Sequence, residues 1–260
     1  MTGFGYNVLG FGAGASSNFN IVISSNTSNF NLQTYLSSNS NYNGSDKITV
    51  RVEILSGVTV NSTSHTTPAF QTGTIGFATT GSLLTIVNKG TIIGAGGRGG
   101  NLTSNNGNNT NADGKADRNG GDGGTALKIT MTTIIDNGEG SLLGGGGGGG
   151  AAAPVDTYGG SGGGGGAGNV FGQGGGGNGS QGTGGSNGDA TNGGGGGNAS
   201  GAESSDGGDG GNLGQAGSDG SSNASAFQAV GTGGSAGKYL EGSDNVTFTS
   251  NGTRTGDTST

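Results

Sequence analysis

Few residues of this chain are able to do chemistry, and none stands in a pattern that defines an enzyme site. The chain has no cysteine, which excludes a thiol nucleophile, a disulfide framework and a thiolate metal site. His65 is the single histidine, so a zinc site with several histidines is excluded. We expect His65 to be a solvated loop residue, and the protein to be no enzyme and to hold no metal and no cofactor.

Glycine-rich motifs that bind nucleotides or calcium are not supported either. GxGxxG patterns arise by chance where glycine is this frequent, so they do not indicate a dinucleotide site. A P-loop ends in Gly-Lys-Ser or Gly-Lys-Thr, whereas Gly237 and Lys238 are followed by Tyr239. Residues 109–114 resemble the start of an EF-hand loop, but Gly120 stands where that loop needs glutamate.

Charge and hydropathy exclude two further classes of partner. The net charge of −7 argues against nucleic acid, whose binders normally carry a basic face. No apolar run approaches the roughly 20 residues of a membrane span, so we expect no membrane insertion. The first residues lack the basic region of a secretory signal, so none is expected.

Glycine dominates the chain and is unevenly distributed. Of the 69 glycines among 260 residues, 55 lie between residues 94 and 237. Glycine buries no side chain and loses the most backbone entropy on ordering, so an apolar core cannot hold that region together. We expect a small β domain over residues 1–93, to which 126–143 and 238–260 return, and a glycine-rich domain over 94–237.

The β domain is expected from short β-branched and alternating runs. No window shows a convincing helical period, so the fold class is all-β with essentially no α-helix. The strands are predicted at 19–23, 48–55, 58–60, 74–77, 83–87, 126–135 and 245–249.

One signal occurs twice and leads into a glycine run each time. Residues 90–100 match 140–150 without gaps at an offset of 50, and an asparagine, Asn88 or Asn137, lies just upstream of each copy. In both copies an apolar pair precedes the glycines. A flexible linker has no need of such a repeated signal, so we expect the chain to leave the β domain at Gly94 and again at Gly144.

About ten glycine runs of five to ten residues follow. Extended polyglycine can form a left-handed threefold helix with a rise of about 3.1 Å and no internal hydrogen bonds. Its N–H and C=O groups point sideways and must be paired when buried. We therefore expect about ten rods packed as a polyglycine II sandwich, held by hydrogen bonds between backbones.

The sequence resembles a known family at this point. The repeated motif reads Asn88-x-Gly90-Thr91-Ile92-x-Gly94-x-Gly96-Gly97-x-Gly99-Gly100. It is similar to one that recurs in tailed-phage tail-tip proteins. A β domain followed by about ten glycine-rich motifs looks like the distal adhesin of T-even-type phage long tail fibres.

The resemblance implies a function, a location and partners. It implies a virion protein, made in the host cytoplasm, at the tip of the tail fibre. Such a protein caps a trimeric fibre shaft and binds an outer-membrane protein or saccharide of the host, which determines host range. One molecule on three chains implies a monomer. Phe4, Tyr6 and Phe11 are the candidate fibre contacts, with a place in the core as the open alternative.

The direction of the rods predicts where the connecting segments lie. If rods alternate in direction, segments 101–118, 151–158, 178–181, 198–206 and 221–230 lie at the end far from the β domain. Segments 169–171, 186–192 and 212–213 then lie near it, with Phe171 as a plug. The far segments are mostly the longer ones, which suits recognition by loops on a rigid scaffold.

The candidate receptor contacts are the side chains of these far segments. Tyr158 and Phe227 are the expected aromatic anchors, and the open alternative is that either one folds over the sandwich edge as a plug. Segment 101–118 is either polar contact surface or a mobile loop. The full set is Pro154, Val155, Asp156, Tyr158, Ser180, Gln181, Glu203, Ser222, Ala226, Phe227 and Val230.

Two other functions fit parts of the sequence. An ice-binding protein can present flat faces of small residues, but the runs show no regular Thr or Ala spacing. A glycine-rich structural protein usually lacks a separate β domain and has tandem low-complexity repeats. Both stay as alternatives to the adhesin.

Overall fold

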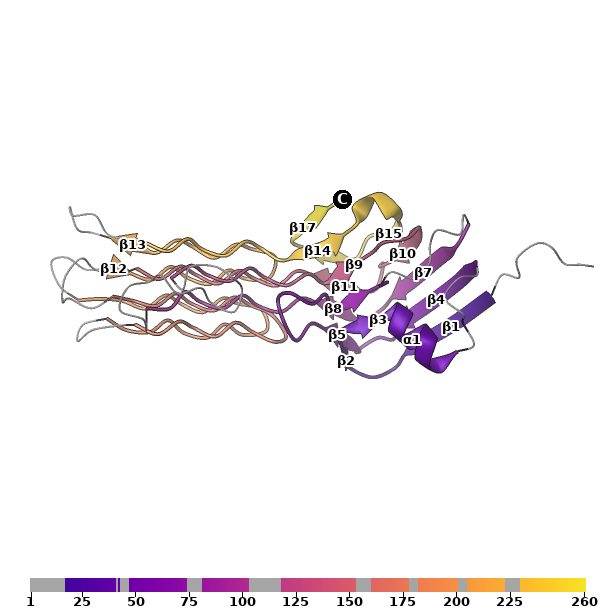
Figure 1. Ribbon diagram of the computed structural model, residues 1–260, viewed down its shortest axis with the longest axis horizontal. Coiled ribbons are helices and arrows are strands. Elements are labelled where there is room, and N and C mark those ends of the chain that lie inside the picture. Colours follow the sequence, from indigo (N-terminus) through magenta and orange to yellow (C-terminus); the bar gives the residue numbers. More distant parts are fainter. Residues whose placement is uncertain are drawn as a thin grey trace, which may run out of the picture.

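The computed structural model describes residues 17–40, 42, 47–73, 81–102, 118–152, 160–177, 182–200, 205–222 and 230–260. The molecule is elongated, with β-sheets at one end and glycine-rich segments running side by side along the long axis (Figure 1). The two parts differ in what holds them together. An apolar core fills the first, and backbone hydrogen bonds cross the second.

Three five-stranded sheets make up the β part, and every strand pair in them is parallel. Sheet A contains β1 (Ser17–Ile23), β4 (Ile48–Ile54), β7 (Leu83–Asn88), β10 (Thr133–Asp136) and β15 (Val246–Ser250). Sheet B contains β2 (Thr27–Ser28), β5 (Thr59–Asn61), β8 (Thr91–Ile93), β11 (Ser141–Leu143) and β16 (Thr253–Thr255). Sheet C contains β3 (Phe30–Asn31), β6 (Phe70–Gln71), β9 (Leu127–Lys128), β14 (Lys238–Glu241) and β17 (Asp257–Ser259).

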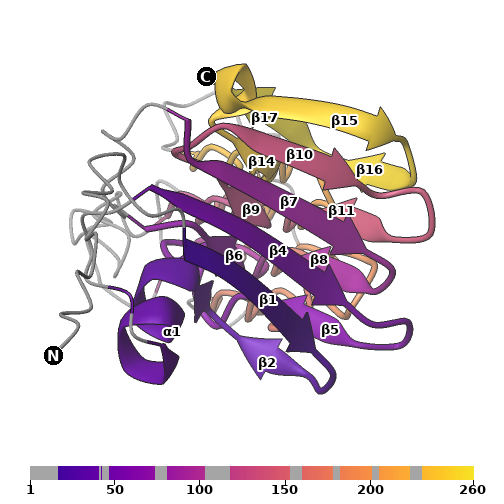
Figure 2. The same cartoon turned by 90° about the vertical axis from the view of Figure 1, so that its right-hand side faces the viewer.

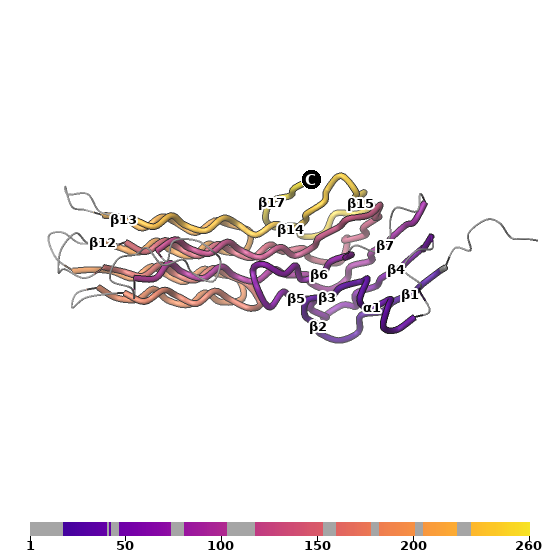
Figure 3. Tube along the Cα trace, in the orientation of Figure 1, coloured from indigo at the N-terminus to yellow at the C-terminus, as the bar shows by residue number. Residues whose placement is uncertain are grey.

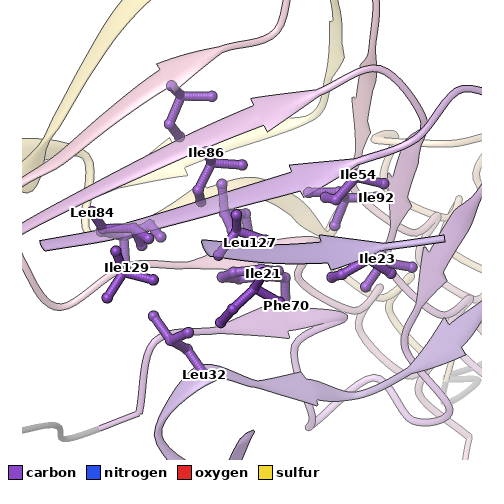
Figure 4. Close-up of a cluster of buried hydrophobic side chains, with 14 of the residues drawn as sticks. Ile21, Ile23, Leu32, Ile54, Phe70, Leu84, Ile86, Ile92, Leu127 and Ile129 are labelled. Atoms are coloured by element: carbon purple, nitrogen blue, oxygen red, sulfur yellow. The ribbon is translucent and has the colours of Figure 1, made fainter. Parts of the chain in front are cut away.

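The chain visits sheets A, B and C in turn five times, so the described strands form a three-sided parallel β-helix of five turns (Figure 2). Alternate residues of each long strand point inward, as in β4, where Ile48, Val50, Val52 and Ile54 are fully buried. Side chains from all three sheets meet inside (Figure 4). Burial of this apolar surface stabilises the β part.

The corner between sheets B and C determines where the glycine segments begin. A single residue makes this corner in the first turn, Asn29 with φ 52°, and in the last, Gly256 with φ 112°. In the third and fourth turns the same corner is replaced by residues 94–126 and 144–237, which follow β8 and β11. Both glycine excursions are therefore insertions at one corner of the β-helix.

The two copies of the repeated motif, 90–100 and 140–150, begin with strands that lie side by side. β8 and β11 pair in parallel, with Thr91 opposite Ser141 and Ile93 opposite Leu143. The two upstream asparagines, Asn88 and Asn137, are buried, and Asn88 Nδ2 donates to Asn137 Oδ1 at 2.7 Å. The offset of 50 residues thus corresponds to one turn of the β-helix.

Most predicted strands are confirmed, with shifts of a residue or two at their ends. Strands lie where 19–23, 48–55, 58–60, 83–87 and 245–249 were predicted. The prediction at 74–77 lies outside the described residues. The described residues are mostly β with one short α-helix, which agrees with the expectation of essentially none.

The short helix, α1 (Leu32–Asn39), was missed by the sequence analysis. Leu32 and Leu36 are its buried residues, and two apolar residues one turn apart give too weak a period to detect. Its N-cap, Asn31, accepts a hydrogen bond from Thr34 N at 3.1 Å. A 3-10 turn, η1 (Ser243–Asn245), precedes β15.

The single strand predicted at 126–135 is wrong. The segment forms two strands in different sheets, β9 in sheet C and β10 in sheet A. The corner between them is held by Thr130, whose backbone N and hydroxyl both bond to the Thr72 hydroxyl. The corner side chains Ile129 and Met131 are buried, so the apolar pattern continues through the bend and conceals it.

In the glycine-rich part, two central segments, 144–152 and 160–168, are buried at every residue. In the first, Gly147, Gly148 and Gly149 donate to Gln215, Gly121 and Gly164. Their carbonyls accept from Gly211, Gly234 and Gly100, and all six distances are 2.7–2.9 Å. Three consecutive residues thus bond to six different segments.

The second central segment repeats this arrangement. The N–H groups of Gly164, Gly165 and Gly166 donate to Gly208, Ser186 and Gly97, and their carbonyls accept from three further segments. The remaining segments run alongside these two (Figure 3) and bond to them. In the outer segment 231–237, Gly231, Gly234 and Gly237 are buried while Thr232 and Ser235 are exposed. Burial therefore recurs every third residue there.

We predict that one added methyl group distinguishes the central from the outer positions. A Cβ at Gly148 would lie 2.0 Å from the Arg98 carbonyl oxygen, whereas a Cβ at Gly195 meets only Asp209 Oδ1, at 3.9 Å. Because backbone cannot move aside, Gly148→Ala should lower the free energy of unfolding by about 3 kcal/mol or more. Gly195→Ala should change it by less than about 0.5 kcal/mol.

Thermal unfolding followed by circular dichroism measures both variants. Gly195→Ala is the matched control, since it makes the same chemical change on an exposed segment. Equal unfolding midpoints for the two variants would contradict the close packing of segment 144–152.

Candidate functional site

The ends of five connecting segments gather at the end of the molecule farthest from sheet A, here called the loop end. The connecting residues themselves, 103–117, 153–159, 178–181, 201–204 and 223–229, lie outside the described residues. The residues on either side of them are described. Bonds among these flanking residues bring the ends of all five segments together.

Ala152 lies at the centre of these contacts. The backbone N–H of Ala152 donates to the Ser161 carbonyl, and the N–H of Ser161 donates to the Ala152 carbonyl, both at 3.0 Å. Ala152 also forms an antiparallel bridge with Val230. This joins the segment that follows Ala152 to the one that ends at Val230. Ala152 and Ser161 are fully buried, so the loop end rests on a packed base.

The other segments join the same base. Gly160 bridges to Ser205, which pairs with Ser222 in the two-stranded sheet of β12 (Ser205–Asp206) and β13 (Ser221–Ser222). Gly182 bridges to Ala199.

The first glycine excursion reaches the same base on both of its sides. Leu102 N donates to the Gly176 carbonyl at 3.2 Å, and Ala151 N donates to the Arg118 carbonyl at 2.7 Å. Leu102 and Arg118, which flank segment 103–117, thus lie beside the flanking residues of the later segments.

The shorter connections lie at the opposite end, beside the β-helix. Gly96 N donates to the Val170 carbonyl, and Gly168 N donates to the Asp189 carbonyl. Gly214 N donates to the Gly144 carbonyl, and Gly144 is the first residue after β11. Within the described residues, the predicted alternation of the segments between two ends is therefore confirmed.

Phe171 lies at this opposite end, as predicted, but it does not act as a plug. Its side chain is 46% exposed, and the neighbouring Val170 is 39% exposed. The turn around them packs through its backbone, by the bond between Gly96 and Val170, which leaves both side chains outside.

Only two of the candidate contacts lie within the described residues. Val230 is 42% exposed at the loop end beside Ala152, and Ser222 is half-buried opposite Ser205. The other receptor candidates lie outside the described residues, as do the three fibre candidates: Pro154, Val155, Asp156, Tyr158, Ser180, Gln181, Glu203, Ala226, Phe227, Phe4, Tyr6 and Phe11.

The polar side chains on the outer segments have a role that the sequence analysis missed. Asp122, Asp209 and Asp219 each accept a hydrogen bond from a backbone N–H of a neighbouring segment, at 2.7–2.8 Å. Asn119, Asn187 and Asn212 do the same at 2.9–3.1 Å. On the outer side of the bundle, these side chains thus take the place of a further glycine segment as the acceptors for backbone N–H groups. In the sequence, the three-residue spacing of Asn119 and Asp122, and of Asp209 and Asn212, could have indicated this role.

Asp189 has the most perturbed acidity among the described residues. The N–H groups of Thr191 and Asn192 donate to its Oδ1, at 2.7 and 2.6 Å. These bonds lower the pKa of Asp189 from 3.8 to about 2. The carboxylate holds the 189–192 turn beside the β-helix, far from the loop end.

The described residues contain no group of histidine, cysteine or acidic side chains able to hold a metal ion. Among the same residues, no helix is long and apolar enough to cross a membrane. His65 is half-buried in the corner between β5 and β6.

Comparison with protein families gives a match over most of the chain. A family model described as phage tail fibre adhesin Gp38 matches residues 18–259. Searches of curated proteins and of solved structures gave no match.

We predict that the three aspartates of the outer segments stabilise the protein as hydrogen-bond acceptors. Changing Asp122, Asp209 and Asp219 to alanine removes three bonds, each contributing about 0.5–1 kcal/mol. The unfolding midpoint of this triple variant should fall clearly in thermal denaturation. Changing the same residues to asparagine keeps the acceptor oxygen and should restore most of the loss. Equal midpoints for the alanine and asparagine variants would refute this role.

We also predict a pH dependence from Asp189. Its pKa is lower in the folded state than in the unfolded state, so the charged form stabilises the fold above about pH 4. That stabilisation is lost as pH falls toward 2. Wild type should therefore unfold at a higher temperature than Asp189→Asn at pH 5, and the difference should shrink by pH 2. A difference that stays constant over pH 2–6 would show that the charge has no part.

Proposed function

The chain belongs to the phage tail fibre adhesin Gp38 family, and we propose that it is the receptor-binding tip protein of a long tail fibre. It caps the trimeric shaft and binds a bacterial outer-membrane protein or saccharide, and so determines host range. A member of this family is a component of the virion. The proposed protein is a monomer that acts by binding and not by catalysis.

The observation that carries this proposal is that the residues flanking five connecting segments gather at the loop end. Ala152, Ser205 and their partners tie the bases of these segments into one packed layer. Loops on a rigid scaffold are where binding residues commonly lie. A layer that collects several loops at one end suits recognition of a cell surface.

The scaffold is proposed to be a sandwich of polyglycine II helices. Support comes from the burial of every third residue in segment 231–237 and from the six hydrogen-bonded neighbours of segment 144–152. A threefold helix brings every third residue to the same side. We assign 94–237 to a receptor-binding domain, and 1–93 with 126–143 and 238–260 to an attachment domain.

Within the loops, Tyr158 and Phe227 are the proposed aromatic anchors, because aromatic side chains are favoured at the energetic centres of interfaces. Their segments leave the same base, since Ala152 and Val230 form a bridge. The remaining proposed contacts are Pro154, Val155, Asp156, Ser180, Gln181, Glu203, Ser222, Ala226 and Val230.

Loop exchange tests the proposal. Residues 153–158 and 223–229 are each replaced by a Gly-Ser sequence of equal length, which leaves the buried base at Ala152 intact. Adsorption of the labelled protein to host cells should fall at least tenfold, while the unfolding midpoint stays within about 2 °C. The matched control, Val170→Ser with Phe171→Ser, removes two exposed apolar side chains at the opposite end and should adsorb normally. Unaltered adsorption after both loop exchanges would refute recognition at the loop end.

A further inference from the structure

The last turn of the β-helix has a free strand edge in each of its three sheets. β15, β16 and β17 form this turn and stand last in the order of their sheets, so within the described residues each pairs on one side only. Figure 2 shows β15 and β16 in yellow at the border of the stacked turns. The backbone groups of a free edge can pair with another chain, which makes such an edge a site of association between copies.

The first turn is covered instead by the segment that follows it. α1 follows β3 and buries its two leucines in the apolar cluster. The Tyr35 ring of α1 lies 5.6 Å from the ring of Phe30 in sheet C, and the Tyr42 ring lies 6.0 Å from that of Phe19 in sheet A. The two ends of the β-helix are therefore closed in different ways.

The inward-pointing rows of side chains change character at the last turn. In sheet B, successive strands place one fully buried apolar residue each at paired positions, Val60, Ile92 and Leu142. Arg254 of β16 takes the next position, opposite Leu142. In sheet C, Thr258 of β17 likewise stands opposite the buried Leu240. The apolar rows of both sheets thus end in a polar residue.

Arg254 lies over aromatic side chains of the two other sheets. Its guanidinium carbon is 4.6 Å from the ring centre of Phe248 in sheet A and 5.7 Å from that of Tyr239 in sheet C. Both rings are half-buried, whereas Arg254 is exposed. A guanidinium is attracted to the face of an aromatic ring, and the apolar stem of arginine covers apolar surface while its charge stays in water.

We propose that Arg254 caps the last turn and prevents a second copy of this chain from pairing with it edge to edge. The proposal deepens the proposed function, since it names the residue that keeps the adhesin a monomer. In a symmetric pair the same surface of each copy meets itself. The two Arg254 charges would then face each other across a surface that loses its water. An inward-pointing charge is one of the devices by which edge strands avoid pairing.

Replacement of Arg254 by leucine tests the cap. Arg254→Leu continues the apolar row of sheet B, so an apolar end with free edges becomes available to a second copy. Size-exclusion chromatography with light scattering should give twice the monomer mass as the protein concentration is raised, whereas wild type keeps the monomer mass. The matched control is Arg51→Leu, the same exchange at an exposed residue of β4, a strand that pairs on both sides. It should stay a monomer.

Three further variants separate the charge from the fold. Arg254→Lys keeps a cation at this position and should remain a monomer. Arg254→Leu with Thr258→Lys moves the cation to the neighbouring strand of the same turn, and should return the leucine variant to the monomer mass. Arg254→Gln removes the charge with little change in length, so it gives the same test if the leucine variant does not fold. Circular dichroism establishes which variants are folded.

The outcomes distinguish the cap from the proposed function. A folded leucine or glutamine variant that stays a monomer would overturn the cap. Equal association of Arg51→Leu, or of Arg254→Lys, would overturn it as well. Association of the wild-type protein itself has a different meaning, since it would overturn the monomer of the proposed function and the cap with it.

Discussion

The close approach of backbones without side chains between them is the constraint on which the glycine-rich part depends. A Cβ at Gly147, Gly148 or Gly149 would lie within 2.1 Å of a carbonyl oxygen of another segment. Real Cβ atoms do not tolerate such contacts, so these three positions have room only for glycine. The outer segments face solvent on one side, and there side chains appear. The composition of the chain is thus a consequence of its packing.

The same constraint explains why a β-helix carries the glycine segments. A glycine segment has no side chains to select its neighbours, so its position must be set elsewhere. β8 and β11 are adjacent in sheet B and deliver two segments side by side and in register. β9 and β14 are adjacent in sheet C and receive the two returning ends. Four strands of an apolar-cored structure therefore anchor a bundle that has no apolar core.

The sequence predicted the parts that depend on local pattern. The run of β4 alternates over seven residues and was recognised, and the signal shared by β8 and β11 revealed that they are related. The alternation of the glycine segments between two ends followed from counting them. The three-sided β-helix did not follow, because β2, β3 and β9 have only two residues each and parallel pairing joins distant parts of the chain.

The contacts at the loop end could not be predicted from the sequence for a related reason. Backbone pairing between Ala152, Ser161 and Val230 leaves no trace in residue type, since any small residue can form it. The residue type alone also does not reveal that Asp122, Asp209 and Asp219 accept hydrogen bonds from backbone N–H groups of neighbouring segments. Polar residues of the segments are thereby committed to the scaffold. Under the proposed function, variation in receptor recognition then falls to the connecting segments of the loop end.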